Sequence, residues 1–122
     1  MITPHTGGRV YVREPYAGAI LRGEKRIETA HIRLPERFAQ VWLDLQTEDR
    51  TAHGRVRFRG HIQWHTVDAF DADVRRHRVE PGSPYHFANR RATFGWLVDA
   101  VEVYRQPKPM LPMNSQFRLE LY

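Results

Sequence analysis

Residues 54–64 alternate between apolar and polar side chains, and this alternation constrains the fold more than any other feature of the chain. The apolar positions are Val56, Phe58, Ile62 and Trp64, and the polar positions are Arg55, Arg57, Arg59, His61 and Gln63. Because successive side chains of a strand point to opposite faces, the pattern predicts a long strand with one buried face. Gly60 lies in the middle of this strand, where it predicts a bulge or a sharp bend of the kind found in small barrels.

Shorter segments with strand character precede and follow this one. We expect further strands at residues 9–13, 26–30, 38–45, 93–104 and 117–122, which are rich in Val, Leu and aromatic side chains. Polar or proline-containing segments predict loops at residues 33–37, 46–53 and 81–84. Residues 106–112 contain three prolines, which predicts an extended connection.

Two short helices are expected between the strands. The first covers residues 16–22, because Pro15 suits a helix start and Gly23 suits a helix end. The second covers residues 67–78, after a cap at Thr66. Its apolar stripe is Val67, Phe70 and Val74, and its acidic side chains come early and its basic ones late.

The order of these elements predicts an α+β fold in which strands dominate. Regular alternation of strands and helices is missing, so a doubly wound sheet is excluded. We expect a small, mixed-pairing β-barrel of about five to seven strands with two short flanking helices. A chain of 122 residues is long enough for one domain, which we place at residues 9–122 after an N-terminal lead-in at residues 1–8.

The charge balance favours a polyanionic partner. The formal net charge is +5, and only Lys25 and Lys108 among the 19 basic residues are lysines. Arginine side chains suit phosphates and base edges, so RNA or a nucleotide is the expected ligand. Arg55, Arg57 and Arg59 would stand about 7 Å apart along one strand, a spacing similar to that of phosphates in a single strand. The alternative is that they form only a solvated outer face.

Several other classes of protein are excluded by composition. The chain has no cysteine, which removes disulfides and thiolate chemistry and fits a cytoplasmic location. It has no apolar run long enough to cross a membrane and no secretory signal. His61 and His65 would stand about 13 Å apart on a strand, too far for one metal ion. We therefore expect no metal, no cofactor and no membrane partner, and a monomer or small homo-oligomer.

Lys25 and Glu28 form a candidate reactive pair just after the first predicted helix. If the two side chains are buried together, Glu28 can act as a general base and Lys25 can stabilise developing negative charge. Residues three apart on a straight strand point to opposite faces, so the pair meets only if Lys25 lies in the turn after Gly23 or a bulge intervenes. The alternative is an ion pair that holds the helix–strand junction together.

The segment that carries this pair resembles the ASCH domain, a family of the PUA-like superfamily. That family has a G-x-K-x-x-E-x-R signature after a short helix, and Gly23, Lys25 and Glu28 match it. The last signature position falls on Ala30 instead of arginine, and Arg33 or His31 is a candidate for the missing cation. Phe94-Gly95-Trp96 resembles the family's aromatic-small-Trp strand.

The resemblance implies a PUA-like barrel with a cleft beside it and a function in RNA binding or in RNA or nucleoside metabolism. Some members are ribonucleases, and others hydrolyse N4-acetylcytidine with a lysine, a threonine three residues later and a later glutamate. Here Lys25 matches the lysine, but Glu28 occupies the nucleophile position and Thr29 is only adjacent. Glu80 is the nearest candidate for the later glutamate. This departure argues against the amidohydrolase mechanism.

Together these observations predict an RNA- or nucleotide-binding domain with a basic cleft next to the signature. The alternative is a small hydrolase of the ribonuclease or N4-acylcytidine amidohydrolase type, in which Lys25 and Glu28 are the catalytic residues. A protein-interaction module is a third possibility. The expected nucleic-acid contacts are Arg13, Lys25, Arg33, Arg55, Arg57 and Arg59, and the residues expected to line the cleft are Tyr16, Tyr85 and Trp96.

Overall fold

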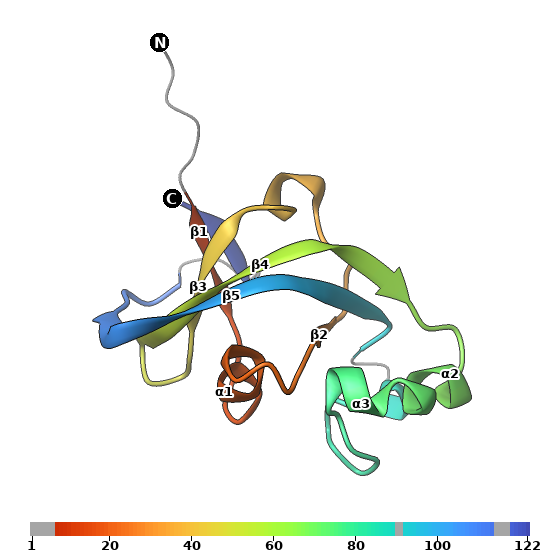
Figure 1. Cartoon of the computed structure of the whole chain (residues 1–122). Coiled ribbons are helices and arrows are strands. Elements are labelled where there is room, and N and C mark those ends of the chain that lie inside the picture. Colours follow the sequence, from red (N-terminus) through yellow and green to blue (C-terminus); the bar gives the residue numbers. More distant parts are fainter. Residues whose placement is uncertain (1–6, 90–91, 114–117) are drawn as a thin grey trace.

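A six-stranded sheet that curls into a half-barrel is the centre of the computed structural model, which describes residues 7–89, 92–113 and 118–122 (Figure 1). Its strands are β1 (Gly8–Tyr11), β2 (Ile27–Ala30), β3 (Trp42–Gln46), β4 (Thr51–Gln63), β5 (Phe94–Pro109) and β6 (Leu119–Leu121). The order across the sheet is β2-β5-β4-β3-β1-β6. Only β1 and β3 pair in parallel, and the other neighbours are antiparallel. The α+β fold class and the mixed strand pairing are therefore confirmed.

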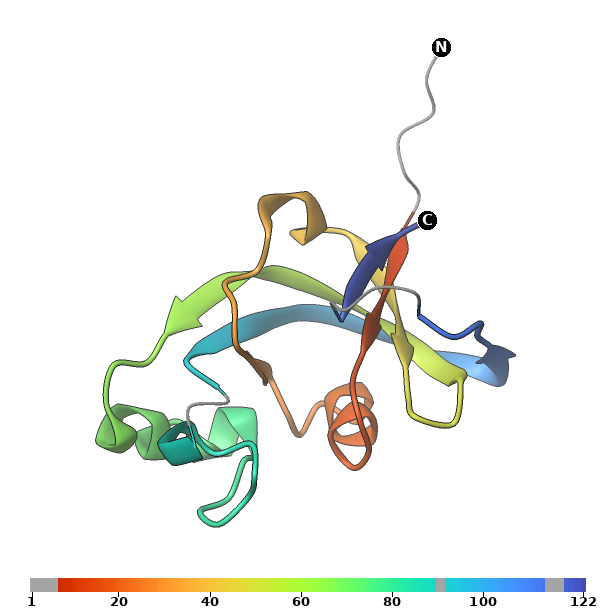
Figure 2. The ribbon, with the colours of Figure 1, turned by 180° about the vertical axis from the view of Figure 1, so that it is seen from behind.

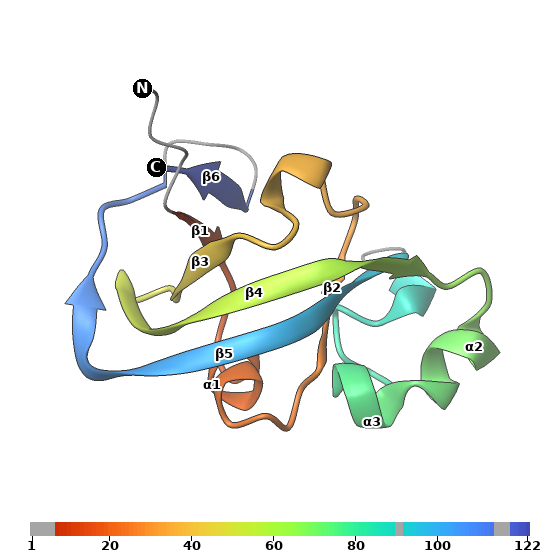
Figure 3. The same ribbon diagram turned by 45° about the horizontal axis from the view of Figure 1, so that its top comes forward.

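The two longest strands, β4 and β5, pair along most of their length and cross the whole molecule (Figure 3). The register between them shifts at Phe58 and Gly60, which confirms the bulge predicted at Gly60. The prediction that residues 106–112 are only a connection is wrong for its first part, because β5 continues to Pro109. β2 pairs with the first four residues of β5, from Phe94 to Leu97. Within the described residues the far end of β5 has no strand neighbour on that side, and it therefore tolerates prolines.

The strand predicted at residues 38–45 begins later than expected. Residues 36–38 form a short 3-10 helix, η1 (Glu36–Phe38), and β3 starts only at Trp42. Phe38 is buried in the core from this helix, so its aromatic character reflects packing instead of strand structure. The turn predicted at residues 46–53 is also shorter, since Arg50 has a positive φ of 60° and β4 begins at Thr51.

Helix α1 (Tyr16–Leu21) is present as predicted, whereas the second predicted helix is broken into α2 (Val67–Ala72) and α3 (Val74–His77). The break falls at Asp73, whose carboxylate accepts hydrogen bonds from Trp64 Nε1 at 2.7 Å and from Arg76. A second 3-10 helix, η2 (Phe87–Asn89), follows. None of the helices in the described residues is of a length and apolarity to span a membrane.

Two clusters of apolar side chains hold the sheet and the helices together. The main core lies inside the curl, where α1 contributes Ala17 and Ile20 against Val56 and Phe58 of β4. The smaller cluster lies where α2 and α3 close one end of the molecule, beyond the end of β4 (Figure 2). It contains Ile27, Trp64, Phe70, Val79 and Ala92. The start of β2 lies between the two clusters, so both of them fix its position.

Asp44 of β3 ties the C-terminal part of the chain to the middle of the sheet. Its buried carboxylate accepts hydrogen bonds from Lys108 Nζ at 2.6 Å and from the hydroxyls of Tyr104 and Tyr122. Burial by itself would raise the pKa of Asp44, but these hydrogen bonds and the Lys108 charge outweigh it, and the net pKa lies below the usual value.

The substitution Asp44→Asn is expected to lower the free energy of unfolding at pH 7 by about 1–3 kcal/mol, because an amide cannot accept three charge-assisted bonds as a carboxylate does. The folded-state pKa of Asp44 is depressed, so its contribution is complete above the unfolded pKa of about 4 and is lost as the pH falls through the folded value. Urea unfolding at several pH values measures this difference. A gap between the two proteins that stays constant down to pH about 2 would contradict the assignment.

Candidate functional site

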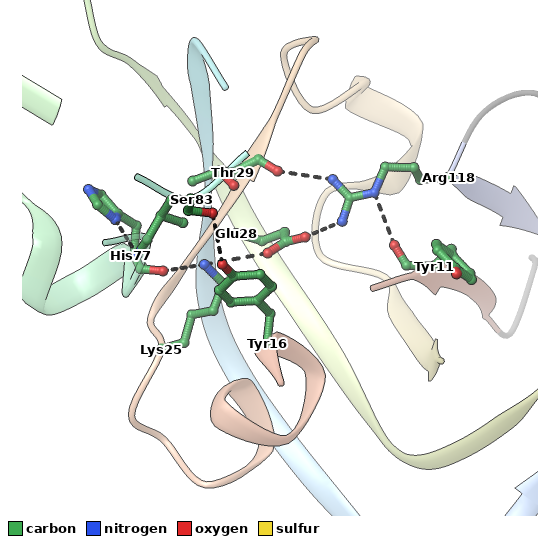
Figure 4. A network of polar contacts seen from close by, with 9 residues as sticks. Tyr11, Tyr16, Lys25, Glu28, Thr29, His77, Ser83 and Arg118 are labelled. Atoms are coloured by element: carbon green, nitrogen blue, oxygen red, sulfur yellow. Dashed lines mark hydrogen bonds and ion pairs between the residues drawn. The ribbon is translucent and has the colours of Figure 1, made fainter. Parts of the chain in front are cut away.

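A pocket of about 230 Å³ opens between α1, β1 and β2 on the core side of the sheet. Its walls are Tyr11, Val12, Arg13, Tyr16, Glu28, Thr29, Ala30, His31, Tyr85 and Arg118. Val12 and Ala30 also belong to the main core, so the pocket is a hollow at the margin of that core. The walls come from segments far apart in the sequence, and the polar network at the floor is shown in Figure 4.

Lys25 reaches this floor because the chain turns sharply after α1. Gly23 has a φ of +80°, a conformation that favours glycine, and the amide of Lys25 donates to the carbonyl of Ala19 at 3.1 Å. Lys25 therefore lies in the turn before β2, which is one of the two conditions under which it meets Glu28. Its Nζ is 3.6 Å from Glu28 Oε1.

The ammonium group of Lys25 is fully buried. Its side chain is 0% exposed, and Nζ donates to the carbonyl oxygen of His77 (Figure 4). It also lies 5.0 Å from the centre of the Tyr16 ring. Burial lowers the pKa of Lys25, while the charge of Glu28 and its hydrogen bond oppose that shift. Lys25 does not line the pocket, whereas its neighbours Tyr16 and Glu28 do.

Arg118, which the sequence did not indicate, is the second cation on Glu28. Its Nη2 donates to Glu28 Oε2, its Nη1 to the carbonyl of Thr29 at 3.0 Å, and its Nε to the carbonyl of Tyr11 at 3.0 Å (Figure 4). The pair is separated by 90 residues in the chain, so no local pattern points to it. One feature of the sequence pointed to a cation from elsewhere in the chain: Ala30 stands where the signature has arginine. The candidates named from the sequence were Arg33 and His31. Both are exposed, and only His31 lines the pocket.

Two tyrosines form one wall of the pocket. The rings of Tyr16 and Tyr85 meet edge to face, with centres 5.8 Å apart and an interplanar angle of 89°. The Tyr16 hydroxyl lies 3.3 Å from Ser83 Oγ, so the loop after α3 is tied to α1 at this point. Arg13 stands at the rim with its side chain 58% exposed and 3.7 Å from Glu48.

The structure separates the remaining predicted residues from this pocket. Trp96 does not line the cleft, contrary to the prediction: it is only 1% exposed, belongs to the main core and donates from Nε1 to the carbonyl of Ile32 at 3.0 Å. Large aromatic side chains on the inner face of a small barrel are needed to fill its core, which explains this position.

The arginine stripe of β4 lies on the other face of the sheet. Arg55 and Arg57 alternate with the core residues Val56 and Phe58, so they point away from the pocket side. Arg55 pairs with Glu102 and Arg57 with Asp99, each at 2.9 Å. Both guanidinium groups lie over the Trp42 ring, at 4.4 and 5.0 Å from its centre. Arg59 donates to the carbonyl of Val98 at 3.0 Å.

Metal ligands do not gather at any point of the described chain. Within residues 7–89, 92–113 and 118–122, no group of three or more His, Cys, Asp or Glu side chains is arranged to hold an ion. His77, the histidine next to Lys25, is buried with both ring nitrogens engaged, by the Val79 amide at 2.9 Å and by the Phe70 carbonyl at 2.7 Å. Burial lowers its pKa, which favours the neutral ring.

The fold is similar to that of solved ASCH structures. Three crystal structures of an ASCH protein from Zymomonas mobilis, including one serine-to-alanine and one tyrosine-to-phenylalanine variant, superpose with TM-scores of 0.75, 0.69 and 0.67. They cover 96–99% of this chain and 87–91% of their own, at 14% sequence identity. No family model and no curated protein matches the sequence. The chain therefore has the ASCH fold, and the predicted resemblance is confirmed at that level.

The charges at the pocket floor predict unequal effects of two near-isosteric substitutions. Glu28→Gln leaves Lys25 and Arg118 without their common counter-ion, and it is expected to lower the free energy of unfolding by about 3–5 kcal/mol. Lys25→Met is expected to cost less, because Glu28 keeps Arg118 and one desolvated charge is removed. Urea denaturation of both variants measures the order, and a larger loss for Lys25→Met would contradict this picture.

Proposed function

We propose that this ASCH-fold protein binds RNA or a free nucleotide, and that one nucleotide unit occupies the pocket between α1, β1 and β2. The observation that carries the proposal is the side-by-side position of a hydrogen-bond acceptor, Glu28, and a donor, Arg118, on the wall of a pocket that tyrosines also line. Base edges carry donors and acceptors side by side, so this pair is complementary to one.

The size and walls of the pocket favour a single nucleotide over a longer stretch. Its volume of about 230 Å³ is below the roughly 300–1,000 Å³ of pockets that enclose a drug-sized ligand. Tyr85 and Tyr16 offer aromatic surface, and stacking of a base on such a ring contributes about 1–3 kcal/mol. A base in the pocket would leave its sugar and phosphate at the rim.

The charges near the pocket favour an anionic ligand. Lys25 and Arg118 together exceed the single charge of Glu28, so the floor has a surplus of one positive charge. Arg13 stands at the rim, more than half exposed, where a phosphate would lie. Arg33 lies in the exposed loop after β2. These positive groups would attract a phosphate and make binding weaken as salt rises.

The arginine stripe is the weaker candidate for the phosphate contacts. The charges of Arg55 and Arg57 are balanced by Glu102 and Asp99, and the stripe does not face the pocket. An RNA strand that leaves the pocket would have to pass around the sheet to reach it. We therefore assign phosphate contacts first to Arg13, and the stripe supplies the matched control.

One observation favours hydrolysis as a second candidate function. The Tyr16 hydroxyl lies 3.3 Å from Ser83 Oγ, and the centre of the Tyr16 ring lies 5.0 Å from Nζ of Lys25, a lysine whose pKa is lowered by burial. A lysine of this kind would assist proton transfer at the tyrosine hydroxyl. Lys25 itself does not reach a substrate in the pocket, because its side chain is fully buried and does not line the pocket. Binding is therefore the function that the geometry supports better.

Binding is tested by the fluorescence anisotropy of a short fluorescein-labelled single-stranded RNA, titrated at several salt concentrations. Tyr85→Ala and Arg13→Ala are each expected to raise the dissociation constant about tenfold, since each loses a contact worth about 1–2 kcal/mol. Arg57→Ala, on the other face, is the control and is expected to leave the affinity unchanged. The four ribonucleoside monophosphates then serve as unlabelled competitors.

Two results would count against the proposal. One is the absence of salt-dependent binding to any of these probes. The other is a loss of affinity with Arg57→Ala that exceeds the loss with both pocket variants, since it would move the interface to the outer face of β4. The melting temperature of each variant shows whether the fold is intact.

Hydrolysis is tested by incubating intact RNA and a mixture of its nucleosides with the protein and following both by mass spectrometry. If the second candidate is right, a product forms with the unaltered protein, and Tyr16→Phe abolishes it while RNA binding changes by less than about twofold. Equal product yields with and without the Tyr16 hydroxyl would remove that group from the mechanism. No product from either sample would leave binding as the function.

A further inference from the structure

The pocket lies where the curled sheet does not close on itself. β2 is the terminal strand at one end of the sheet and pairs only with β5, while β1 lies toward the other end and pairs with β3 and β6. Among the described residues, no strand ladder joins β1 to β2. The pocket walls come from both sides of this seam, with Tyr11 and Val12 at β1 and with Glu28, Thr29 and Ala30 on β2.

Arg118 is the side chain that bridges this seam. It enters from the residue before β6 and donates to the carbonyl of Tyr11 on β1 and to both Thr29 and Glu28 on β2. Its guanidinium group also lies 5.2 Å from the centre of the Trp96 ring, on the strand next to β2. Four contacts on three strands hold the plane of the guanidinium group in one orientation at the pocket wall.

The guanidinium group is also accessible to a ligand. Arginine has five N–H donors, and three of those of Arg118 have acceptors among the described residues. Its side chain is 30% exposed and lines the pocket, unlike the enclosed Lys25. A fixed guanidinium with two further donors is suited to an oxygen acceptor.

We propose that Arg118 is the ligand-binding cation of this pocket and the positioning residue of Glu28. It orients the Glu28 carboxylate from across the seam and donates its remaining N–H groups to an oxygen of the bound nucleotide. This rests on the proposed binding function and assigns it a residue outside the signature. Arg118 thus supplies the positive charge that the ASCH signature places two residues after Glu28, where this chain has Ala30.

Position 30 allows this replacement to be reversed. Glu28 and Ala30 are two residues apart on β2, so their side chains share one face, and both line the pocket. An arginine at position 30 would need space, and truncating the side chain at position 118 supplies that space next to Glu28. The pair Ala30→Arg and Arg118→Ala therefore moves the cation from one side of the seam to the other.

The test uses the labelled RNA probe described above and a matched pair of variants. Arg118→Met and Arg118→Lys both keep an unbranched chain over Trp96, and they differ in charge. Arg118→Met is expected to weaken RNA binding about tenfold or more, since hydrogen bonds to a charged group are lost. Arg118→Lys is expected to recover part of this loss, and the double variant Ala30→Arg/Arg118→Ala is expected to bind more tightly than Arg118→Ala alone.

The outcomes separate this inference from the proposed function. If the unaltered protein does not bind the probe, the proposed function fails and the inference fails with it. If it binds and Arg118→Met binds equally well, the inference alone is overturned. Equal losses for Arg118→Met and Arg118→Lys, at equal melting temperatures, would also overturn it, because charge would then have no effect. If the double variant does not fold, the comparison of Arg118→Met with Arg118→Lys tests the inference by itself.

Discussion

Glu28 is a carboxylate buried to 5% exposure, and it is held there by two cations that approach from different parts of the chain. A buried carboxylate without partners would cost several kcal/mol, and Lys25 and Arg118 together offset that cost, with Arg118 remaining as a partner when Lys25 is removed. Lys25 arrives by a local turn, whereas Arg118 arrives from the end of the chain. The pocket wall, the seam between β1 and β2 and the last strand therefore depend on one another through this carboxylate.

A second buried carboxylate has a similar role on another part of the sheet. Asp44 gathers Lys108 and the hydroxyls of Tyr104 and Tyr122, all from the last part of the chain. Glu28 and Asp44 both lie in the first half of the sequence, and each accepts hydrogen bonds from side chains in the second half. These contacts hold the far end of β5 and the C-terminal residues against the sheet, in addition to the apolar packing of Leu119 in the main core.

The same electrostatics shape the choice between binding and hydrolysis. In the ion triad of Lys25, Glu28 and Arg118, Lys25 is enclosed, and Arg118 is hydrogen-bonded to β1 and β2 and lies over the Trp96 ring of β5. Groups held this firmly are suited to present fixed donors and acceptors to a ligand, because little side-chain freedom is lost on binding. Hydrolysis would need a group that reaches the substrate, and on the pocket wall that role falls to the Tyr16 hydroxyl instead of Lys25.

The sequence by itself determined the local features of this protein. The period-two pattern of β4, the bulge at Gly60 and the helix between Pro15 and Gly23 all follow from backbone preferences over a few residues. For Lys25 and Glu28 the sequence stated the condition under which they meet, and the structure meets it with a turn after Gly23. Tertiary structure decided the rest. Phe38 and Trp96 were drawn into the core because a small barrel must be filled. The second helix is broken at Asp73, which accepts a hydrogen bond from Trp64, and β5 continued through its prolines where, among the described residues, it pairs with β4 on one side alone. The arginine that completes the pocket lies 90 residues from Glu28 in the chain. No spacing rule reaches that far, because such a contact depends on how the whole sheet curls and which of its edges remain open.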